Sequence, residues 1–169
     1  MEYFTEQDFL SAKAQRKTWL IIYFIVLGVY VLVSAGLLVW YLLLPYQSPV
    51  ITTVKLIHYP LTALFVIFSF VYLGIPYKRV NRFYKMCLNI KTGHRDEWTG
   101  SFFEYDETLQ DKDGVDFKSL VFIEWNQYKK DYFERKVLVF NEKPFPEIPE
   151  NATVKYVTQS NVLVSYEII

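Results

Sequence analysis

An uninterrupted apolar segment runs from Trp19 to Leu44 and contains no charged residue. A helix of these twenty-six residues would extend about 39 Å, which is enough to cross the ~30 Å hydrocarbon core of a bilayer with some tilt. A cleaved signal peptide would have a shorter apolar core and small residues at its cleavage site, whereas this segment ends in the bulky sequence WYLLLPYQSP. Residues 19–44 are therefore predicted to form a first transmembrane helix.

A second apolar segment lies between Lys55 and Lys78 and contains His58 but no residue with a permanent charge. A helix from Pro60 to Ile75 would be too short for the bilayer core, so helical structure is expected to begin near residues 52–53 and to kink at Pro60. We assign residues 45–55 to a loop and residues 56–75 to a second transmembrane helix.

Residues 76–95 are strongly basic and amphipathic. Their helical pattern begins at Pro76, which suits a first helical position, and stops at Gly93. Apolar residues recur at the spacing of one helix face: Val80, Phe83, Tyr84, Cys87 and Leu88. Four basic residues fall largely on the other side: Lys78, Arg79, Arg82 and Lys85. Such a helix can bind an anionic lipid bilayer, or serve as a stalk whose apolar face packs on the protein's own domain, and the pattern leaves both open.

The positions of basic residues near the spans predict the orientation. Three basic residues precede the first span and the basic helix follows the second, whereas the connection at 45–55 contains only Lys55. Because basic residues are enriched on the cytoplasmic side, we predict a multi-pass protein of the cell membrane with both termini cytoplasmic and the 45–55 loop outside. Residues 1–18 are predicted to form a short cytoplasmic helix, which Thr5 and Asp8 cap and Phe4 and Phe9 staple.

From Asp96 onward the pattern changes to short alternating segments typical of β-strands. The segment EWTGSFFEYDET is followed by the turn signal QDKDG, and VDFKSLVFIEWN breaks strict alternation in a way that predicts a bulge near residues 118–120. The segment QYKKD is predicted to turn the chain before the strand YFERKVLVFNE. The proline-rich KPFPEIPEN is predicted to be a connection, and TVKYVT and VLVSYEII a hairpin around QSN.

These segments predict a two-helix transmembrane hairpin plus a small all-β domain, 96–169, built as a five-stranded barrel, OB-like, or as a sandwich. Two membrane helices followed by such a barrel resemble the short NfeD-like membrane proteins, and NATVKYVTQSNVLVSYEI resembles their closing hairpin. The resemblance implies an OB-fold over residues 97–169. The glycine-rich turns of that family are not present, and Pro149, Glu150 and Asn151 stand where a glycine would be expected.

Charge and composition argue against several classes of function. Residues 96–169 contain fifteen acidic and eight basic residues, and a domain with this excess of negative charge repels nucleic acid. Two histidines on opposite sides of a membrane cannot form one metal site, the single cysteine Cys87 excludes an internal disulfide, and no glycine-rich phosphate loop occurs. We therefore expect no enzyme activity, no cofactor and no metal. Cys87 suits an apolar position on a helix face, with palmitoylation as the alternative.

The predicted spans carry no Asp, Glu, Lys or Arg between their ends, which argues against a transporter acting alone. Small residues on the spans could pack the hairpin internally or bind another membrane protein: Gly28, Ala35, Gly36, Ala63 and Gly74. A homo-oligomer is a further option for the chain as a whole. The sequence thus favours a membrane-anchored, non-enzymatic adaptor or scaffold whose β domain binds a cytoplasmic or membrane protein. The alternative is an accessory subunit of a membrane enzyme or transporter complex.

Overall fold

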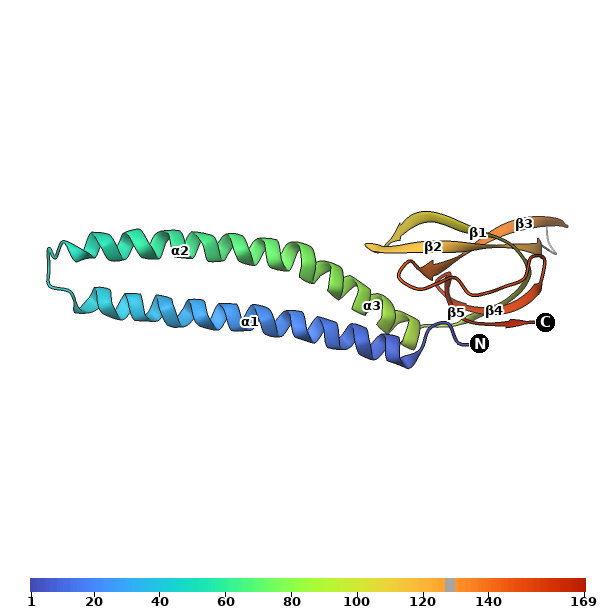
Figure 1. Cartoon of the computed structure of the whole chain (residues 1–169), viewed down its shortest axis with the longest axis horizontal. Coiled ribbons are helices and arrows are strands. Elements are labelled where there is room, and N and C mark those ends of the chain that lie inside the picture. The colour runs from blue at the N-terminus through green and yellow to red at the C-terminus, as the bar shows by residue number, and fades with distance from the viewer. Residues whose placement is uncertain (127–129) are drawn as a thin grey trace. The chain divides into compact units, whose positions relative to one another are not determined.

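The computed structural model describes residues 1–126 and 130–169 and contains helices followed by strands (Figure 1). The helical elements are α1 (Glu6–Leu43), α2 (Val50–Tyr72), a π-helical turn η1 (Leu73–Tyr77) and α3 (Lys78–Thr92). The strands are β1 (Asp96–Lys112), β2 (Val115–Asn126), β3 (Asp131–Phe140), β4 (Thr153–Gln159) and β5 (Val162–Ile168). These elements form two compact units. The hairpin unit is Ala14–Asn81, and the barrel unit combines Met1–Lys13 with Arg82–Ile169.

In the hairpin unit, α1 and α2 lie side by side (Figure 1). The most apolar 18-residue windows of the two helical stretches have mean hydropathies of 2.5 and 1.9, and neither window has a buried residue. Two helices are therefore long and apolar enough to cross a membrane. The helix predicted within residues 1–18 and the first predicted span are one continuous helix, α1.

The second helix differs from its prediction at both ends. It begins at Val50, directly after Pro49, so most of the predicted 45–55 loop is helical. Pro60 lies inside α2, and the departure from the α-helical pattern falls instead at Leu73–Tyr77, around Pro76. Because proline lacks an N–H and crowds the preceding turn, a wider π-helical turn accommodates it without ending the helix. The separate helix start predicted at Pro76 is wrong, whereas the stop at Gly93 is confirmed.

The strands form a closed barrel in the order β1-β2-β3-β5-β4, which confirms the predicted small all-β, OB-like barrel. All neighbours are antiparallel except β3 and β5, which meet in parallel at Leu138 and Val162 alone. The β1–β2 and β4–β5 turns have two residues each, and both residues have positive φ, as tight hairpins require: Asp113, Gly114, Ser160 and Asn161. The first of these turns is shorter than predicted because β1 continues to Lys112.

The bulge predicted near residues 118–120 is wrong. The β2–β3 register is continuous through that stretch, and the irregularities lie in β1, between Phe102 and Glu104 and between Asp106 and Gln110. Strand β2 breaks strict alternation because both of its faces are covered. Phe117 packs in a core outside the barrel, whereas Leu120 and Phe122 pack in the interior core.

The proline-rich connection between β3 and β4 is confirmed, since residues 141–152 form no strand. The Tyr105 hydroxyl holds it against the barrel by donating to the Pro146 carbonyl at 2.9 Å and accepting from the Ile148 N–H at 3.0 Å. Of the predicted QYKKD turn, residues 127–129 lie outside the described part of the chain.

Candidate functional site

The barrel unit has a second core on its outer surface, built partly from the helices. Residues of the α1 N-terminal region (Phe4, Phe9, Ala12) and of α3 (Met86, Cys87, Ile90) are buried against residues of β2, β3 and β5 (Phe117, Leu138, Phe140, Val162, Val164). This outer core decides between the two predictions for the apolar face of α3. From residue 83 onward that face packs on the protein's own barrel, as the stalk prediction required, and Cys87 is a filler within it.

Cys87 is fully buried, and burial raises the pKa of its thiol to about 12. A protonated and inaccessible thiol is a poor nucleophile. The structure therefore does not favour palmitoylation at this position.

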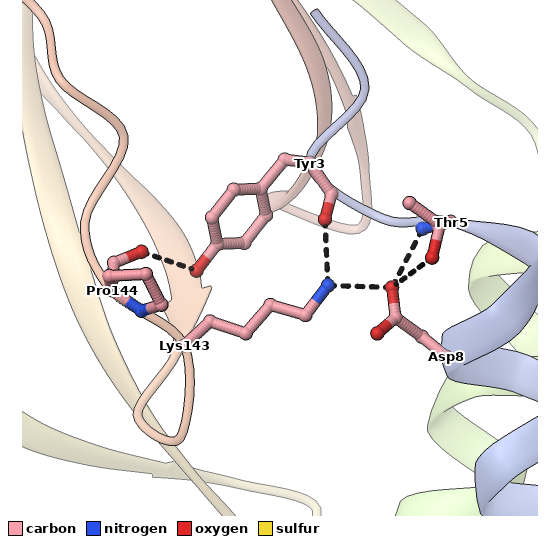
Figure 2. Close-up of polar contacts among 5 residues, drawn as sticks. All are labelled: Tyr3, Thr5, Asp8, Lys143 and Pro144. Carbon is pink, nitrogen blue, oxygen red and sulfur yellow. Dashed lines mark hydrogen bonds and ion pairs between the residues drawn. The ribbon is translucent and has the colours of Figure 1, made fainter.

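The N-terminal segment is held on β5 by a small set of polar contacts, which we call the clasp. The N–H groups of Tyr3 and Phe4 donate to the Val164 carbonyl at 2.9 Å. The Lys143 ammonium donates to the Tyr3 carbonyl at 2.8 Å and to Asp8 Oδ2 at 2.6 Å (Figure 2). Asp8 Oδ2 also accepts from the N–H and hydroxyl of Thr5, which confirms the predicted cap. Tyr3 also lies with its hydroxyl toward the Pro144 carbonyl (Figure 2).

The clasp shifts the titration of its carboxylate. Burial alone would raise the pKa of Asp8, but the hydrogen bonds from Lys143 and Thr5 outweigh burial and lower it. Asp8 is therefore ionised at neutral pH and is paired with Lys143. This pairing ties the first turn of α1 to the β3–β4 connection within the barrel unit.

The four basic residues predicted to face lipid are all exposed. Lys78 and Arg79 belong to the hairpin unit, whereas Arg82 and Lys85 belong to the barrel unit. Arg82 lies against the β1–β2 turn, since a Cβ atom at Gly114 would collide with its guanidinium group. Gly114 also has a φ of +76°, so a side chain there would be strained as well as crowded.

The small residues predicted for helix packing do not pack the hairpin. A Cβ atom at Gly28, Gly36 or Gly74 would meet no other atom within 4 Å, and Ala35 and Ala63 are exposed. The internal packing alternative is therefore wrong for these residues, which lie on the outer surface of the hairpin unit.

Aromatic and hydroxyl side chains make the helix–helix contact instead. The Tyr30 and Phe65 rings stack at 4.1 Å between centroids, and the Tyr30 hydroxyl donates to Thr62 Oγ1 at 3.1 Å. Tyr72 donates to the Trp19 carbonyl at 2.9 Å. Aromatic residues recur at helical spacings of three, four and seven positions in both apolar segments: Trp19, Tyr23 and Tyr30, and Phe65, Phe68 and Tyr72. This spacing was a signal for the contact, but the surrounding residues are uniformly apolar and mask it.

A buried polar cluster inside the barrel was not predicted. Glu124 is 5% exposed; it accepts a hydrogen bond from the hydroxyl of the fully buried Tyr156 and pairs with Arg135, whose Nε lies 2.9 Å from Glu124 Oε1. The Arg135 guanidinium stacks 3.7 Å from the centre of the Trp98 ring and 5.6 Å from that of Phe133. Gly100 makes room for the carboxylate, because a Cβ there would lie 3.0 Å from Glu124 Cγ.

This cluster pairs a buried carboxylate with a cation inside the barrel. Burial and the neighbouring Glu124 raise the pKa of Tyr156, so its hydroxyl stays protonated. The cluster is therefore a rigid polar group within an apolar core, made of a protonated tyrosine, a paired glutamate and an arginine stacked on aromatic rings. Its best supported role is structural.

Aromatic side chains are exposed on the barrel near the β2–β3 end. Trp125 is 51% and Tyr132 67% exposed, and their rings pack edge to face at 4.9 Å between centroids. Phe133 is 37% exposed. As the neighbour of Tyr132 along β3, Phe133 points to the opposite face of the strand, beside Arg135. We call Trp125 and Tyr132 the aromatic patch. Tyr and Trp are enriched in the centres of protein interfaces, where they bury large areas at low entropic cost.

The described residues contain no group of three or more His, Cys, Asp or Glu side chains that could hold a metal ion. His58 lies in α2 of the hairpin unit and His94 follows α3 in the barrel unit, as expected from their separation in the sequence.

Comparison of the chain with protein-family models, curated proteins and solved structures gave no match. The resemblance to NfeD-like proteins therefore stays a prediction, and the function is argued from the chain's own geometry.

Proposed function

We propose that this protein is a membrane-anchored, non-enzymatic adaptor whose barrel binds a protein partner. The observation that carries the proposal is the aromatic patch, in which Trp125 and Tyr132 are 51% and 67% exposed and pack against each other. Phe103, Tyr105 and Phe133 are also exposed, whereas most other aromatics of the barrel lie in its cores. The hairpin supplies the anchor, since both helices are long and apolar enough to cross a bilayer.

We further propose that both ends of the hairpin face the cytoplasm. Contacts of residues 3 and 4 with Val164 support this, because a segment and a strand that fold together must lie on the same side of a membrane. The excess of basic residues at that end of the hairpin supports the cytoplasmic side. Labelling of introduced cysteines from each side of the membrane tests this orientation.

Anionic lipid is the proposed partner of the exposed cations Lys78, Arg79 and Lys85. The full chain, purified from bilayers of equal phosphatidylglycerol and phosphatidylcholine, should retain more phosphatidylglycerol than a variant with Lys78→Gln and Lys85→Gln. Equal retention by the two proteins would contradict this part of the proposal.

The second candidate is an accessory subunit of a membrane complex, with the hairpin bound to another membrane protein. The exposed positions of Gly28, Gly36 and Ala63 favour it, because small residues let a second helix approach closely.

One experiment separates the two candidates. The full chain is isolated from its native membranes with mass spectrometry of the bound proteins, alongside a Trp125→Ser/Tyr132→Ser variant and a Gly28→Leu/Gly36→Leu variant. Loss of a reproducible partner with the first variant alone supports the adaptor. Loss with the second variant alone supports the accessory subunit and contradicts the adaptor.

A further inference from the structure

The outer edge of β3 is open along half of its length. Strand β3 pairs with β2 from Asp131 to Phe140, but its other edge meets β5 only at Leu138. Among the described residues, no backbone hydrogen bond reaches that other edge between residues 131 and 136. An open edge of this kind presents unpaired N–H and C=O groups and is a template for another strand.

The register identifies which backbone groups point outward. The N–H of Leu138 donates away from β2, to the Asn161 carbonyl at 2.7 Å. Because β3 has no bulge against β2 and alternate residues point the same way, the N–H and C=O groups of Tyr132, Glu134 and Lys136 face the open edge. The Tyr132 N–H is already capped by the Asp131 side chain at 2.8 Å, which leaves Glu134 and Lys136 as outward donors.

A groove of about 350 Å³ adjoins this edge, lined by Gln110, Asp111, Lys112, Lys136, Leu138 and Asn161. Lys136 is paired with Asp106 at 2.8 Å, and the hydrogen bond from Lys136 holds the pKa of Asp106 well below its usual range. The groove lining itself holds Asp111, Lys112 and Lys136, whereas strands β1 to β3 together carry ten acidic and four basic residues. The net negative charge of these strands as a whole therefore favours a basic occupant.

The barrel already covers the exposed part of β5 with its own N-terminal segment. Beyond the end of β3, strand β5 is paired with the N-terminal segment through an antiparallel bridge between Glu2 and Ser165 and through the bonds to Val164. Residues 131–136 of β3 lie before the start of β5, and no segment among the described residues pairs with their open edge. Tyr132 of the aromatic patch and Phe133 are exposed on β3 itself, on its two opposite faces.

We propose that the open edge of β3, over residues 131–136, binds an extended basic segment of the partner protein as an added β-strand. Backbone hydrogen bonds to Glu134 and Lys136 would hold the segment, and Tyr132 and Phe133 would contact its apolar side chains. This inference rests on the proposed adaptor function and names the kind of partner segment that the barrel takes.

The test uses the full chain in lipid nanodiscs and a defined probe, an eight-residue peptide of alternating valine and lysine. We expect the peptide to slow amide hydrogen exchange at Glu134 and Lys136. Glu134→Pro removes one outward N–H without touching the β2 pairing, since proline is tolerated on the open side of an edge strand. It should weaken peptide binding at least tenfold, whereas the matched Glu134→Gln variant should stay within about threefold.

Unchanged exchange at Val137 and Val139 in the proline variant confirms that the barrel is folded. Three results would each overturn the inference. The first is that millimolar peptide does not slow amide exchange at Glu134 and Lys136. The second is that a fully N-methylated peptide binds as tightly as the unmodified one. The third is that exchange slows without peptide as the protein concentration rises. The last result would assign the edge to a second copy of the chain. The Trp125→Ser/Tyr132→Ser variant separates this inference from the adaptor proposal. If that variant loses its native partner while any of the three results occurs, the adaptor proposal survives. Binding by an added β-strand is then ruled out.

Discussion

At the scale of single residues, Glu124 shows how the barrel tolerates a charge in its core. The carboxylate is surrounded by Tyr156, Arg135 and the aromatic rings that cover the arginine. A buried ion pair contributes little relative to apolar replacements, but loss of one partner leaves an uncompensated charge. Removing one partner of the pair should therefore destabilise the barrel much more than replacing both.

Arg135→Met should destabilise the barrel by about 3–5 kcal/mol, because Glu124 would then be buried without its cation. The double variant Arg135→Met/Glu124→Gln should recover most of that loss, since no net charge remains inside. Denaturant unfolding of the full chain in detergent, followed by tryptophan fluorescence, measures both. A double variant as unstable as the single one would show that Arg135 acts through packing on Trp98.

Asp8 makes the clasp sensitive to acid. A carboxylate with a lowered pKa in the folded state stabilises the fold above its unfolded pKa of about 3.9, and this stabilisation is lost as pH falls through the folded value. Hydrogen exchange at the Tyr3 and Phe4 amides should therefore report an opening of the clasp below about pH 4, after correction for the intrinsic rate. In Asp8→Asn the clasp should be weaker at neutral pH and its opening should no longer vary over that range.

At the scale of elements, the barrel unit is larger than the strands that define it. A fragment limited to residues 96–169 would uncover the faces of Phe117, Leu138, Phe140, Val162 and Val164 that the helices cover. The boundary predicted at Asp96 marks a change of composition, whereas the packing boundary lies inside α1 and α3.

Ile90 tests this packing boundary. It is fully buried in the outer core, so Ile90→Ala should cost about 2–5 kcal/mol in the free energy of unfolding of the barrel. The exposed neighbour Asn89 provides the control, since Asn89→Ala should change stability by less than about 0.5 kcal/mol. Equal effects of the two substitutions would contradict the outer core.

In the hairpin, large aromatic residues make the contact between the helices and the small residues do not. Phe65→Ala should weaken the association of α1 with α2, because it removes the ring stacked on Tyr30. Gly28→Leu should leave it unchanged, because the glycine faces open space. Reversible unfolding of the full chain in mixed micelles measures both effects. A larger loss with Gly28→Leu would show that the glycine lies in a helix–helix contact after all.

At the scale of the whole molecule, the proposed orientation places the connection between α1 and α2 outside and the β4–β5 turn in the cytoplasm. A membrane-impermeant maleimide should label Ser48→Cys in intact cells and should label Ser160→Cys only after lysis. The native Cys87 needs no replacement, because its thiol is buried and its pKa is about 12. Labelling of Ser160→Cys in intact cells would reverse the orientation.

The sequence was sufficient for the features that depend on local pattern. The apolar segments predicted the hairpin, the turn residues predicted the β4–β5 hairpin, and Gly93 predicted the end of α3. Features that depend on distant contacts were missed. Phe4 and Ile90 belong to the same outer core although they are 86 positions apart in the sequence, and β2 alternates irregularly because a helix covers its outer side. The buried polar cluster around Glu124 was missed for the same reason, since its members come from four strands.

Because the clasp pairs Tyr3 with Val164, the barrel unit closes late during synthesis. About 160 residues separate these partners, and a ribosome working at about 5–20 residues per second would take roughly 8–30 s to make them. During that interval Phe4 and Phe9 have no barrel to pack on. During the proposed membrane insertion, the nascent chain therefore presents an exposed aromatic segment beside its first hydrophobic helix, which is the kind of surface that chaperones shield.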